Sequence, residues 1–213
     1  MNLDSAIESL IEAGRWLDAR GCAPATSGNY SLRLGPGRIL VTASGKHKGR
    51  LTRDDFVIVD EEGRKVDGPA QGSPSAETDL HALLFRLDPR CGAVLHTHSV
   101  PTTVLGLSLA GARTLELTGY EMLKAFPGVV THTANVSIPV FENSQDVPAL
   151  AREVEARWGA STKGSGTAQP FPGYILRGHG LYAWGDDLPL ALRSVEALEF
   201  LVACELERRK LPA

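Results

Sequence analysis

The chain has 213 residues, enough for one sizeable hydrophobic core, and we expect a single domain over residues 1–213. A hydrophobic share of 43% and a net charge of -3 are typical of an ordinary globular protein and give no reason to expect nucleic acid or an acidic membrane surface as a partner. No apolar run approaches the length of a membrane span, no secretory leader is recognisable, and the three cysteines are scattered. We therefore expect a cytoplasmic protein without disulfides.

The first part of the chain predicts one helix followed by two hairpins. Apolar residues recur at a helical period over residues 4–19. Residues 31–34 and 38–42 lie on either side of a Gly-Pro-Gly turn, which is typical of a hairpin. Residues 56–59 and 64–66 form a second such pair around an acidic, glycine-containing turn.

A second helix is expected to begin at Ser73, which suits an N-cap and is followed by Pro74 at the first helical position. Its buried stripe is made of leucines, and Asp88 with the proline after it ends the helix. Glu77 continues that stripe toward the helix N-terminus. The pattern leaves open whether this carboxylate caps the edge of the core or faces a functional site.

The rest of the chain alternates strands and helices without forming a simple βαβ series. The proline at position 139 suggests that its strand lies at a sheet edge or that the strand starts there. Because several strands are joined as hairpins, we expect a mixed or antiparallel sheet flanked by helices. The expected helices are 100–109, 119–124, 147–158 and 188–209, the expected strands are 114–117, 138–141, 173–177 and 181–184, and a flexible loop is expected over 161–172.

Two histidines close the apolar strand of residues 93–95. His96 and His98 are two positions apart, so on a strand both side chains point to the same face. Both imidazoles can then reach one point, which is the arrangement of a paired metal site; a catalytic zinc usually takes three protein ligands and keeps one open position. Two polar residues on a loop beside a sheet are an equally good interpretation of an isolated His-x-His.

A third histidine, His179, lies between two glycines that join two apolar strands. Glycines allow close backbone approach, which suits a histidine directed into a crowded site, although a plain turn histidine is the more common meaning. With His96 and His98 it completes a three-histidine set, and Glu77 is a conceivable fourth ligand. We expect no ligand role for the remaining histidines, His47, His81 and His132.

Three short segments at the ends of expected elements could hold an anion, because they offer hydroxyls and backbone N–H groups. The last of them is also the expected start of a helix, where free N–H groups and the helix dipole favour a phosphate. For each segment taken alone, ordinary turn chemistry is the better interpretation. The candidate residues are Ser27, Gly28, Asn29, Ser44, Gly45, Ser73 and Ser75.

Taken together and in order, these motifs resemble the class II (zinc) aldolase family from about residue 5 to 209. The matching motifs are Ser27-Gly28-Asn29, residues 42–45, 51–56 and 74–78, His96-Thr97-His98-Ser99 and Gly178-His179-Gly180. The resemblance implies an αβα sandwich with a mixed, largely antiparallel sheet. It also implies a homo-oligomer, expected to be a homotetramer, with active sites near subunit interfaces.

The same resemblance implies a site and a substrate class. One Zn²⁺ per subunit would be held by His96, His98 and His179, with Glu77 making a further contact to the metal or the substrate. The substrate is expected to be a small sugar phosphate whose phosphate binds to the Ser/Gly/Asn segments named above.

Within that family, three segments resemble the dehydratases that act on a methylthio-substituted ketose 1-phosphate in methionine salvage, namely residues 44–50, 119–126 and 139–146. In those enzymes the glutamate that matches Glu121 is the acid/base, whereas the pattern alone favours a solvated helix residue. The expected reaction is loss of water to give a 2,3-diketone phosphate. The alternatives are a sugar-phosphate aldolase or epimerase and, less favoured, a non-catalytic scaffold domain, which would not need the three histidines.

Overall fold

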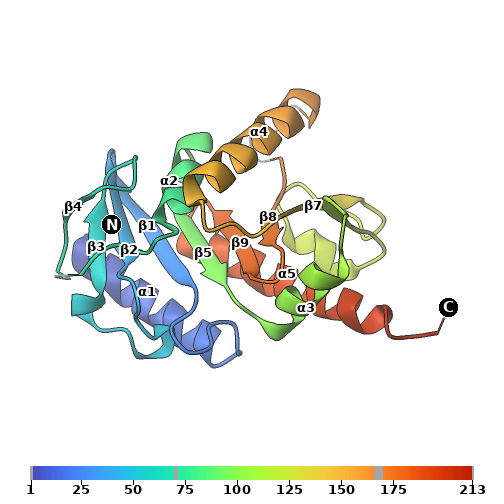
Figure 1. The fold of residues 1–213 in the computed structure, drawn as a ribbon, viewed down its shortest axis with the longest axis horizontal. Helices are drawn as coiled ribbons and strands as arrows, with labels where there is room; N and C mark the ends of the chain where they lie inside the picture. Colours follow the sequence, from blue (N-terminus) through green and yellow to red (C-terminus); the bar gives the residue numbers. More distant parts are fainter. Residues whose placement is uncertain (1, 70–71, 166–169, 213) are drawn as a thin grey trace.

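The computed structural model describes residues 2–69, 72–165 and 170–212, which form a nine-stranded sheet with helices on both faces (Figure 1). The strands lie in the order β4-β3-β2-β1-β5-β9-β8-β7-β6, and every neighbouring pair is antiparallel except β7 with β8. The strands are β1 (Asn29–Gly35), β2 (Arg38–Thr42), β3 (Phe56–Val59), β4 (Lys65–Asp67), β5 (Ala93–Thr97), β6 (Thr114–Leu117), β7 (Val136–Phe141), β8 (Gly173–Leu176) and β9 (Gly180–Gly185). The helices are α1 (Leu3–Asp18), α2 (Thr78–Leu87), α3 (Val100–Ser108), α4 (Val147–Ser165) and α5 (Leu188–Arg208), with short 3-10 helices η1 (Lys48–Arg50), η2 (Arg53–Asp55) and η3 (Glu121–Ala125).

The sheet has two apolar faces because successive side chains of a strand point to opposite sides. In β5, Ala93 and Leu95 belong to one core, which includes residues of α1, α3 and α5. Val94, between them, belongs to the other core, which includes residues of α2 and α4. Helices α2 and α4 cover one face and α1 and α5 the other (Figure 1). The predicted αβα sandwich with a mixed, largely antiparallel sheet is confirmed.

The start of α2 was predicted wrongly. The helix begins at Thr78, with Glu77 at the N-cap position, and not after Ser73. Pro74 instead pairs with Ala43 in an isolated antiparallel bridge, and the carbonyl of Ser73 accepts a hydrogen bond of 3.1 Å from the backbone N–H of Ser44. A contact between distant segments thus overrides a local capping pattern, and it joins this loop to the end of β2.

Two further predictions need correction. β7 is not at the edge of the sheet, since it lies between β6 and β8. Pro139 nevertheless pairs with β6 alone, and pairing with β8 begins at Val140, so the proline lies where one side of the strand is free. The helix expected to end at residue 158 continues to Ser165, because extending a helix is easier than starting one. Residues 166–169 of the predicted loop lie outside the described residues.

A continuous line of aromatic rings runs through one core toward the end of β5. Trp158 of α4 lies 5.5 Å from Trp184, measured between ring centroids, and Trp184 lies 6.1 Å from Tyr174. Tyr174 stacks on Tyr182 at 4.8 Å, and Tyr182 stacks on His96 at 4.1 Å. His96 is fully buried at the end of this line, so its ring position is set by close packing.

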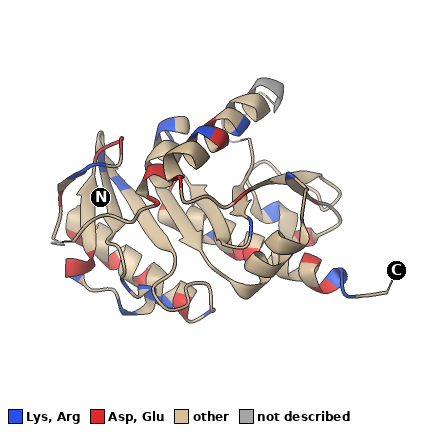
Figure 2. Ribbon diagram, in the orientation of Figure 1, with Lys and Arg blue, Asp and Glu red and all other residues tan. Residues whose placement is uncertain are grey.

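Charged side chains of both signs are intermingled along α4 and along the C-terminal part of α5 (Figure 2). Within the described residues, we find no helix whose length and apolar character would let it cross a bilayer.

Candidate metal centre

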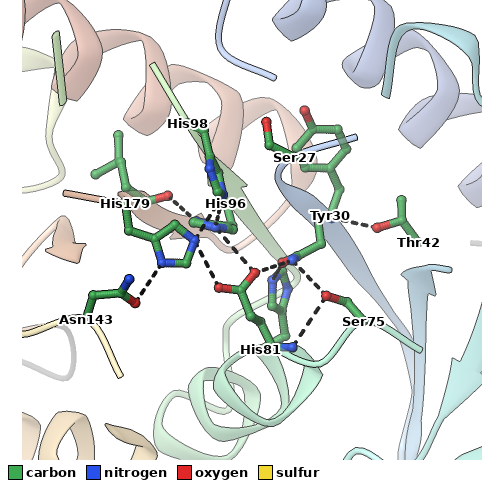
Figure 3. Close-up of polar contacts among 12 residues, drawn as sticks. Ser27, Tyr30, Thr42, Ser75, His81, His96, His98, Asn143 and His179 are labelled. Atoms are coloured by element: carbon green, nitrogen blue, oxygen red, sulfur yellow. Dashed lines mark hydrogen bonds and ion pairs between the residues drawn. The ribbon is translucent and has the colours of Figure 1, made fainter. Parts of the chain in front are cut away.

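Four side chains from three separate segments converge at one end of the central strands (Figure 3). His96 ends the buried run of β5 and His98 follows it, while His179 lies in the turn from β8 to β9. Because β9 pairs directly with β5, that turn lies beside the two other histidines. Glu77 comes from the residue before α2. One nitrogen or oxygen from each residue lies within 4.8 Å of the others.

The ligand atoms of these four residues face a common centre. The Nε2 atom of His98 lies 2.8 Å from Nε2 of His96 and 3.1 Å from Nε2 of His179. The two carboxylate oxygens of Glu77 lie 3.4 Å from Nε2 of His96 and 3.2 Å from Nε2 of His179. Three imidazole nitrogens and a carboxylate are a donor set that suits zinc.

The second ring nitrogen of two histidines is fixed by an acceptor. Nδ1 of His96 lies 3.0 Å from the carbonyl oxygen of Leu181, and Nδ1 of His179 lies 3.1 Å from Oδ1 of Asn143. An oxygen acceptor requires an N–H at Nδ1, so the lone pair of each imidazole is at Nε2 and is directed to the centre. Hydrogen bonds of this kind orient the histidine ligands of a metal ion.

Burial keeps two of the histidines neutral. The pKa of His96 is well below its ordinary value, chiefly because the ring is buried and also because His98 and His179 lie beside it. Burial, together with His179 and Lys48, lowers the pKa of His98 to about 4. Neutral imidazoles are the form that binds a metal ion. The residues present therefore fit a divalent cation.

The predicted anion-binding segments lie on three loops that are joined to one another beside Glu77. The buried ammonium of Lys48 donates to the carbonyl of Thr26 at 2.7 Å and to that of Lys46. Burial lowers the pKa of Lys48 to about 8. This residue therefore ties the loop that contains Ser27 and Gly28 to the loop that contains Ser44 and Gly45.

The third loop, which contains Ser73 and Ser75, is tied to both of the others. The backbone bond from Ser44 to Ser73 joins it to the second loop. The amide of Asn29 donates to Oγ of Ser75 at 3.0 Å and so joins it to the start of β1. Ser27 donates its hydroxyl to the carbonyl of Pro24 at 2.7 Å. The structure thus brings six of the seven predicted anion-site residues onto adjoining loops and places Asn29 beside them at the start of β1; their role in binding a substrate stays a prediction.

Glu121 lies elsewhere in the chain. It opens η3, which packs against α5, and its side chain is 71% exposed. Within the described residues its carboxylate pairs with Lys124 and lies 3.8 Å from Nδ1 of His132. It makes no contact with the histidine cluster of its own chain there. A sequence motif could not reveal this separation.

The other three histidines are outside the four-residue group. His47 accepts a hydrogen bond from the backbone of Gly49, His132 lies near Glu121, and His81 is fully buried in α2. The roles of Lys48, Asn143 and Tyr182 around the cluster were not predicted. Lys48 and Asn143 lie in two of the segments noted for their family resemblance, whereas no sequence pattern indicated Tyr182.

An open cavity of about 580 Å³ lies against the cluster and is lined by both His98 and His179. Its lining also includes Val100 and Val104 of α3, which are 72% and 43% exposed. The cavity is thus lined by polar residues of the cluster and by exposed apolar residues of a helix.

Comparison with known proteins places this arrangement in a family. The profile of the class II aldolase and adducin N-terminal domain matches residues 8–206. Methylthioribulose-1-phosphate dehydratase of Marinobacter nauticus is 47% identical over 207 residues, covering 97% of this chain and 95% of that protein. The protein of the same name from Pseudomonas aeruginosa is 49% identical over 207 residues, covering 97% and 96%.

Solved structures of other proteins have the same fold as this chain. YgbL from Klebsiella pneumoniae superposes with a TM-score of 0.80 at 23% identity, covering 100% of this chain and 93% of that one. L-fuculose-1-phosphate aldolase from Thermus thermophilus superposes with a TM-score of 0.71 at 24% identity, covering 97% and 96%. The chain belongs to the class II aldolase and adducin N-terminal domain family.

Proposed function

We propose that the protein is a zinc-dependent dehydratase that converts 5-methylthioribulose 1-phosphate to 2,3-diketo-5-methylthiopentyl 1-phosphate and water in cytoplasmic methionine salvage. The observation that supports this most is identity of 47% and 49% to two dehydratases of this name over almost the whole of each chain. The three histidines and the carboxylate of the cluster are residue types that zinc-dependent chemistry uses.

His96, His98 and His179 would hold one Zn²⁺, with Glu77 as a further contact. The bound ion would supply Lewis-acid stabilisation of negative charge on the substrate oxygens, an effect worth several kcal/mol. The protein contributes the orientation: the acceptors at Leu181 and Asn143 direct two of the imidazoles to the centre.

The three joined loops would bind the substrate phosphate. They offer backbone N–H groups and serine hydroxyls, and the ammonium of Lys48 adds a positive charge behind them. Holding the phosphate there fixes the direction of the sugar chain, so binding energy far from the reaction supplies alignment. The methylthio end would then lie on the apolar wall formed by Val100 and Val104.

Glu121 would act as the acid/base. As general base it takes the proton from C3, the C4–O bond breaks, and the same carboxyl returns the proton to the departing hydroxyl, which leaves as water. The enol that remains becomes the 2,3-diketone. General acid–base assistance of this kind contributes typically about 10²- to 10⁴-fold.

Since Glu121 does not reach the cluster of its own chain, a neighbouring subunit would deliver it to the site. Helix α3 offers a surface for such a neighbour beside the cavity: Val100, Val104 and Leu107 recur at helical spacing and are 72%, 43% and 59% exposed. We therefore propose a homotetramer whose active sites lie near subunit interfaces.

The test is NMR of the zinc-loaded protein incubated with methylthioribulose 1-phosphate, with a Glu121→Gln variant in parallel. We expect the diketone phosphate to appear with the parent protein and to be lost in the variant while the metal stays bound. Unchanged substrate with the parent protein would refute the dehydratase. Cleavage into two smaller fragments would assign the protein to the sugar-phosphate aldolases instead.

A further inference from the structure

A buried line of hydrogen bonds reaches Glu77 from the side opposite the histidines. The amide nitrogen of Asn29 donates to Oε2 of Glu77 at 2.8 Å and to Oγ of Ser75 at 3.0 Å. The amide oxygen of Asn29 meets Nε2 of His81, and Nδ1 of His81 lies 2.6 Å from the hydroxyl of Ser31. Asn29 is 3% exposed, and His81 and Ser31 are fully buried.

The direction of every bond in this line follows from Glu77. An ionised carboxylate only accepts hydrogen bonds, so Asn29 must present its NH₂ group to Glu77 and its oxygen to His81. That oxygen needs a donor, which places the single proton of neutral His81 on Nε2. Nδ1 then accepts the hydroxyl proton of Ser31. The reverse orientation of the amide would place its oxygen against the carboxylate and leave two acceptors facing each other.

His81 stays neutral throughout the ordinary pH range, because burial lowers its pKa to about 3. It is separated by 52 residues from Asn29, and Asn29 by 48 from Glu77, so only the folded chain brings the three together. Each side-chain nitrogen and oxygen of Asn29 and His81 has a partner in this line, which is the condition under which a buried polar network fixes a single geometry.

The line also determines what Ser75 can do. Its oxygen accepts from the amide of Asn29 and, at 3.4 Å, from the backbone N–H of Glu77. With both acceptor positions used, its own proton is available to a third group. Ser75 is therefore set as a donor, which suits an anionic oxygen of a ligand.

We propose that His81 is a positioning residue: as the Nε2–H tautomer it holds the amide of Asn29 in one orientation, and Asn29 in turn directs Glu77 at the three histidines and Ser75 at an anionic ligand group. The inference rests on the cluster being a metal site and not on which sugar phosphate is the substrate. Groups in this position around a metal typically change its affinity by about 10- to 100-fold when they are replaced.

The first test is NMR of the metal-free protein labelled with ¹⁵N at histidine, in which two-bond ¹H–¹⁵N correlations distinguish the two neutral tautomers. We expect His81 to carry its proton on Nε2 at pH 7. A proton on Nδ1, or a mixture of both forms, would overturn the proposal. This measurement needs neither metal nor substrate, so it stands even if the dehydratase assignment fails.

The second test compares the Zn²⁺ affinity of two variants by competition with a chromophoric chelator. His81→Leu removes the donor, and we expect a loss of about 10- to 100-fold. His81→Gln places an amide N–H near the position of Nε2, and we expect it to remain within a few-fold of the parent. His132→Leu, which removes a histidine outside the line, is the control and should leave the affinity unchanged.

Two results would contradict the proposal. An equal loss in the Leu and Gln variants would show that the ring shape matters and not its N–H group. No loss in a folded Leu variant would show that Asn29 keeps its orientation unaided. If the Leu variant does not fold, the tautomer measurement and the Gln variant still decide the question.

Discussion

Gly28 has no room for a side chain. Its φ of +75° is a left-handed backbone conformation, and a Cβ atom built there would lie 2.6 Å from the carbonyl oxygen of His96. The loop before β1 therefore passes directly over the backbone of a metal-site residue. A substitution at this position must move either the loop or the end of β5.

We predict that Gly28→Ala disturbs the site far more than its backbone conformation alone requires. Gly21 is the matched control, since its φ is +72° and a Cβ there meets nothing within 4 Å. Gly21→Ala should cost roughly 1–2 kcal/mol of stability, the usual penalty for a left-handed residue. Gly28→Ala should cost more and should also weaken Zn²⁺ binding. Equal losses in urea unfolding and an unchanged zinc affinity would show that the contact with His96 is unimportant.

Three buried or half-buried histidines make the stability of the metal-free protein depend on pH. The pKa values of His81, His96 and His98 are all lowered by burial, to about 3 for His81 and about 4 for His98. As the pH falls below the ordinary histidine value of about 6.5, the unfolded chain binds protons that the folded chain does not. The contribution of these histidines to stability is therefore fully present above that pH and is lost progressively as the pH falls below it.

For His81 we predict a contribution of about 1.4 kcal/mol per pH unit below pH 6.5, which is the value for one proton. Urea unfolding of the metal-free parent and of His81→Gln, measured from pH 7 to pH 5, checks this. As the pH falls, the free energy of unfolding should decrease less steeply for the variant than for the parent. The difference between the two slopes should correspond to about one proton. Parallel curves for the two proteins would mean that His81 is not the buried neutral group described.

Individual residues were predictable where a local pattern dictates geometry. The spacing of His96 and His98 and the glycines around His179 indicated three histidines that the fold does bring together; their role as ligands stays a prediction. The amide of Asn29 donates to Glu77 and Ser75, contacts that were not predicted, and its expected role in binding a phosphate stays a prediction. The part played by His81 was not predictable, since its partners come from a strand about 50 residues away in sequence.

Helix α5 holds the segment around His98 through one carboxylate. Glu199 accepts hydroxyl hydrogen bonds from Thr97 at 2.6 Å, from Thr102 at 2.9 Å and from Ser99. His98 lies between Thr97 and Ser99, so both of its neighbours in the chain are fixed to the same group on α5. Ser99 is also the N-cap of α3.

We predict that Glu199→Gln weakens this attachment. A glutamine offers one acceptor oxygen in place of two, which leaves a buried hydroxyl without a partner at a cost of about 1–3 kcal/mol. Glu196→Gln is the control, because Glu196 is exposed on the same helix. Thermal unfolding should show a lower Tm for the Glu199 variant only, with weaker zinc binding. The same Tm in both variants would contradict the role given to Glu199.

Most helices and strands follow from local patterns, whereas the corrected boundaries depend on contacts between segments. The hairpins of β1 with β2 and of β3 with β4 have turn signals within a few residues. The start of α2 does not follow its capping signal, because Pro74 pairs with Ala43. The isolated bridge holds Pro74 outside the helix, which begins at Thr78.

The order of the strands could not have been predicted from the sequence. Strands β5 and β9 are separated by more than eighty residues, and yet they pair at the centre of the sheet and place His179 beside His96. The fold class, in contrast, could be predicted from the excess of hairpins over βαβ units together with the family resemblance. That one domain spans the whole chain stays a prediction.

Shared active sites predict that two inactive variants will restore activity when they are combined. Glu121→Gln keeps the histidines, and His98→Ala keeps Glu121. In mixed oligomers, a site with histidines from the first variant and Glu121 from the second is complete. Random mixing should recover up to about a quarter of the parent activity.

The measurement is dehydratase activity after the two variants have been unfolded and refolded together, compared with the same variants refolded apart and then mixed. Recovery only after joint refolding would establish that neighbouring subunits share a site. No recovery, with mixed oligomers demonstrated by native mass spectrometry, would place Glu121 and the cluster in the same chain or would remove Glu121 from the mechanism.

The line of aromatic rings that ends at His96 gives the protein an internal optical probe. Tyr182 and Tyr174 separate His96 from Trp184, and each ring stacks on or touches the next. A paramagnetic, coloured ion such as Co²⁺ at the histidines should therefore quench the emission of Trp184 through energy transfer. Occupancy of the site could then be followed during a titration without any label.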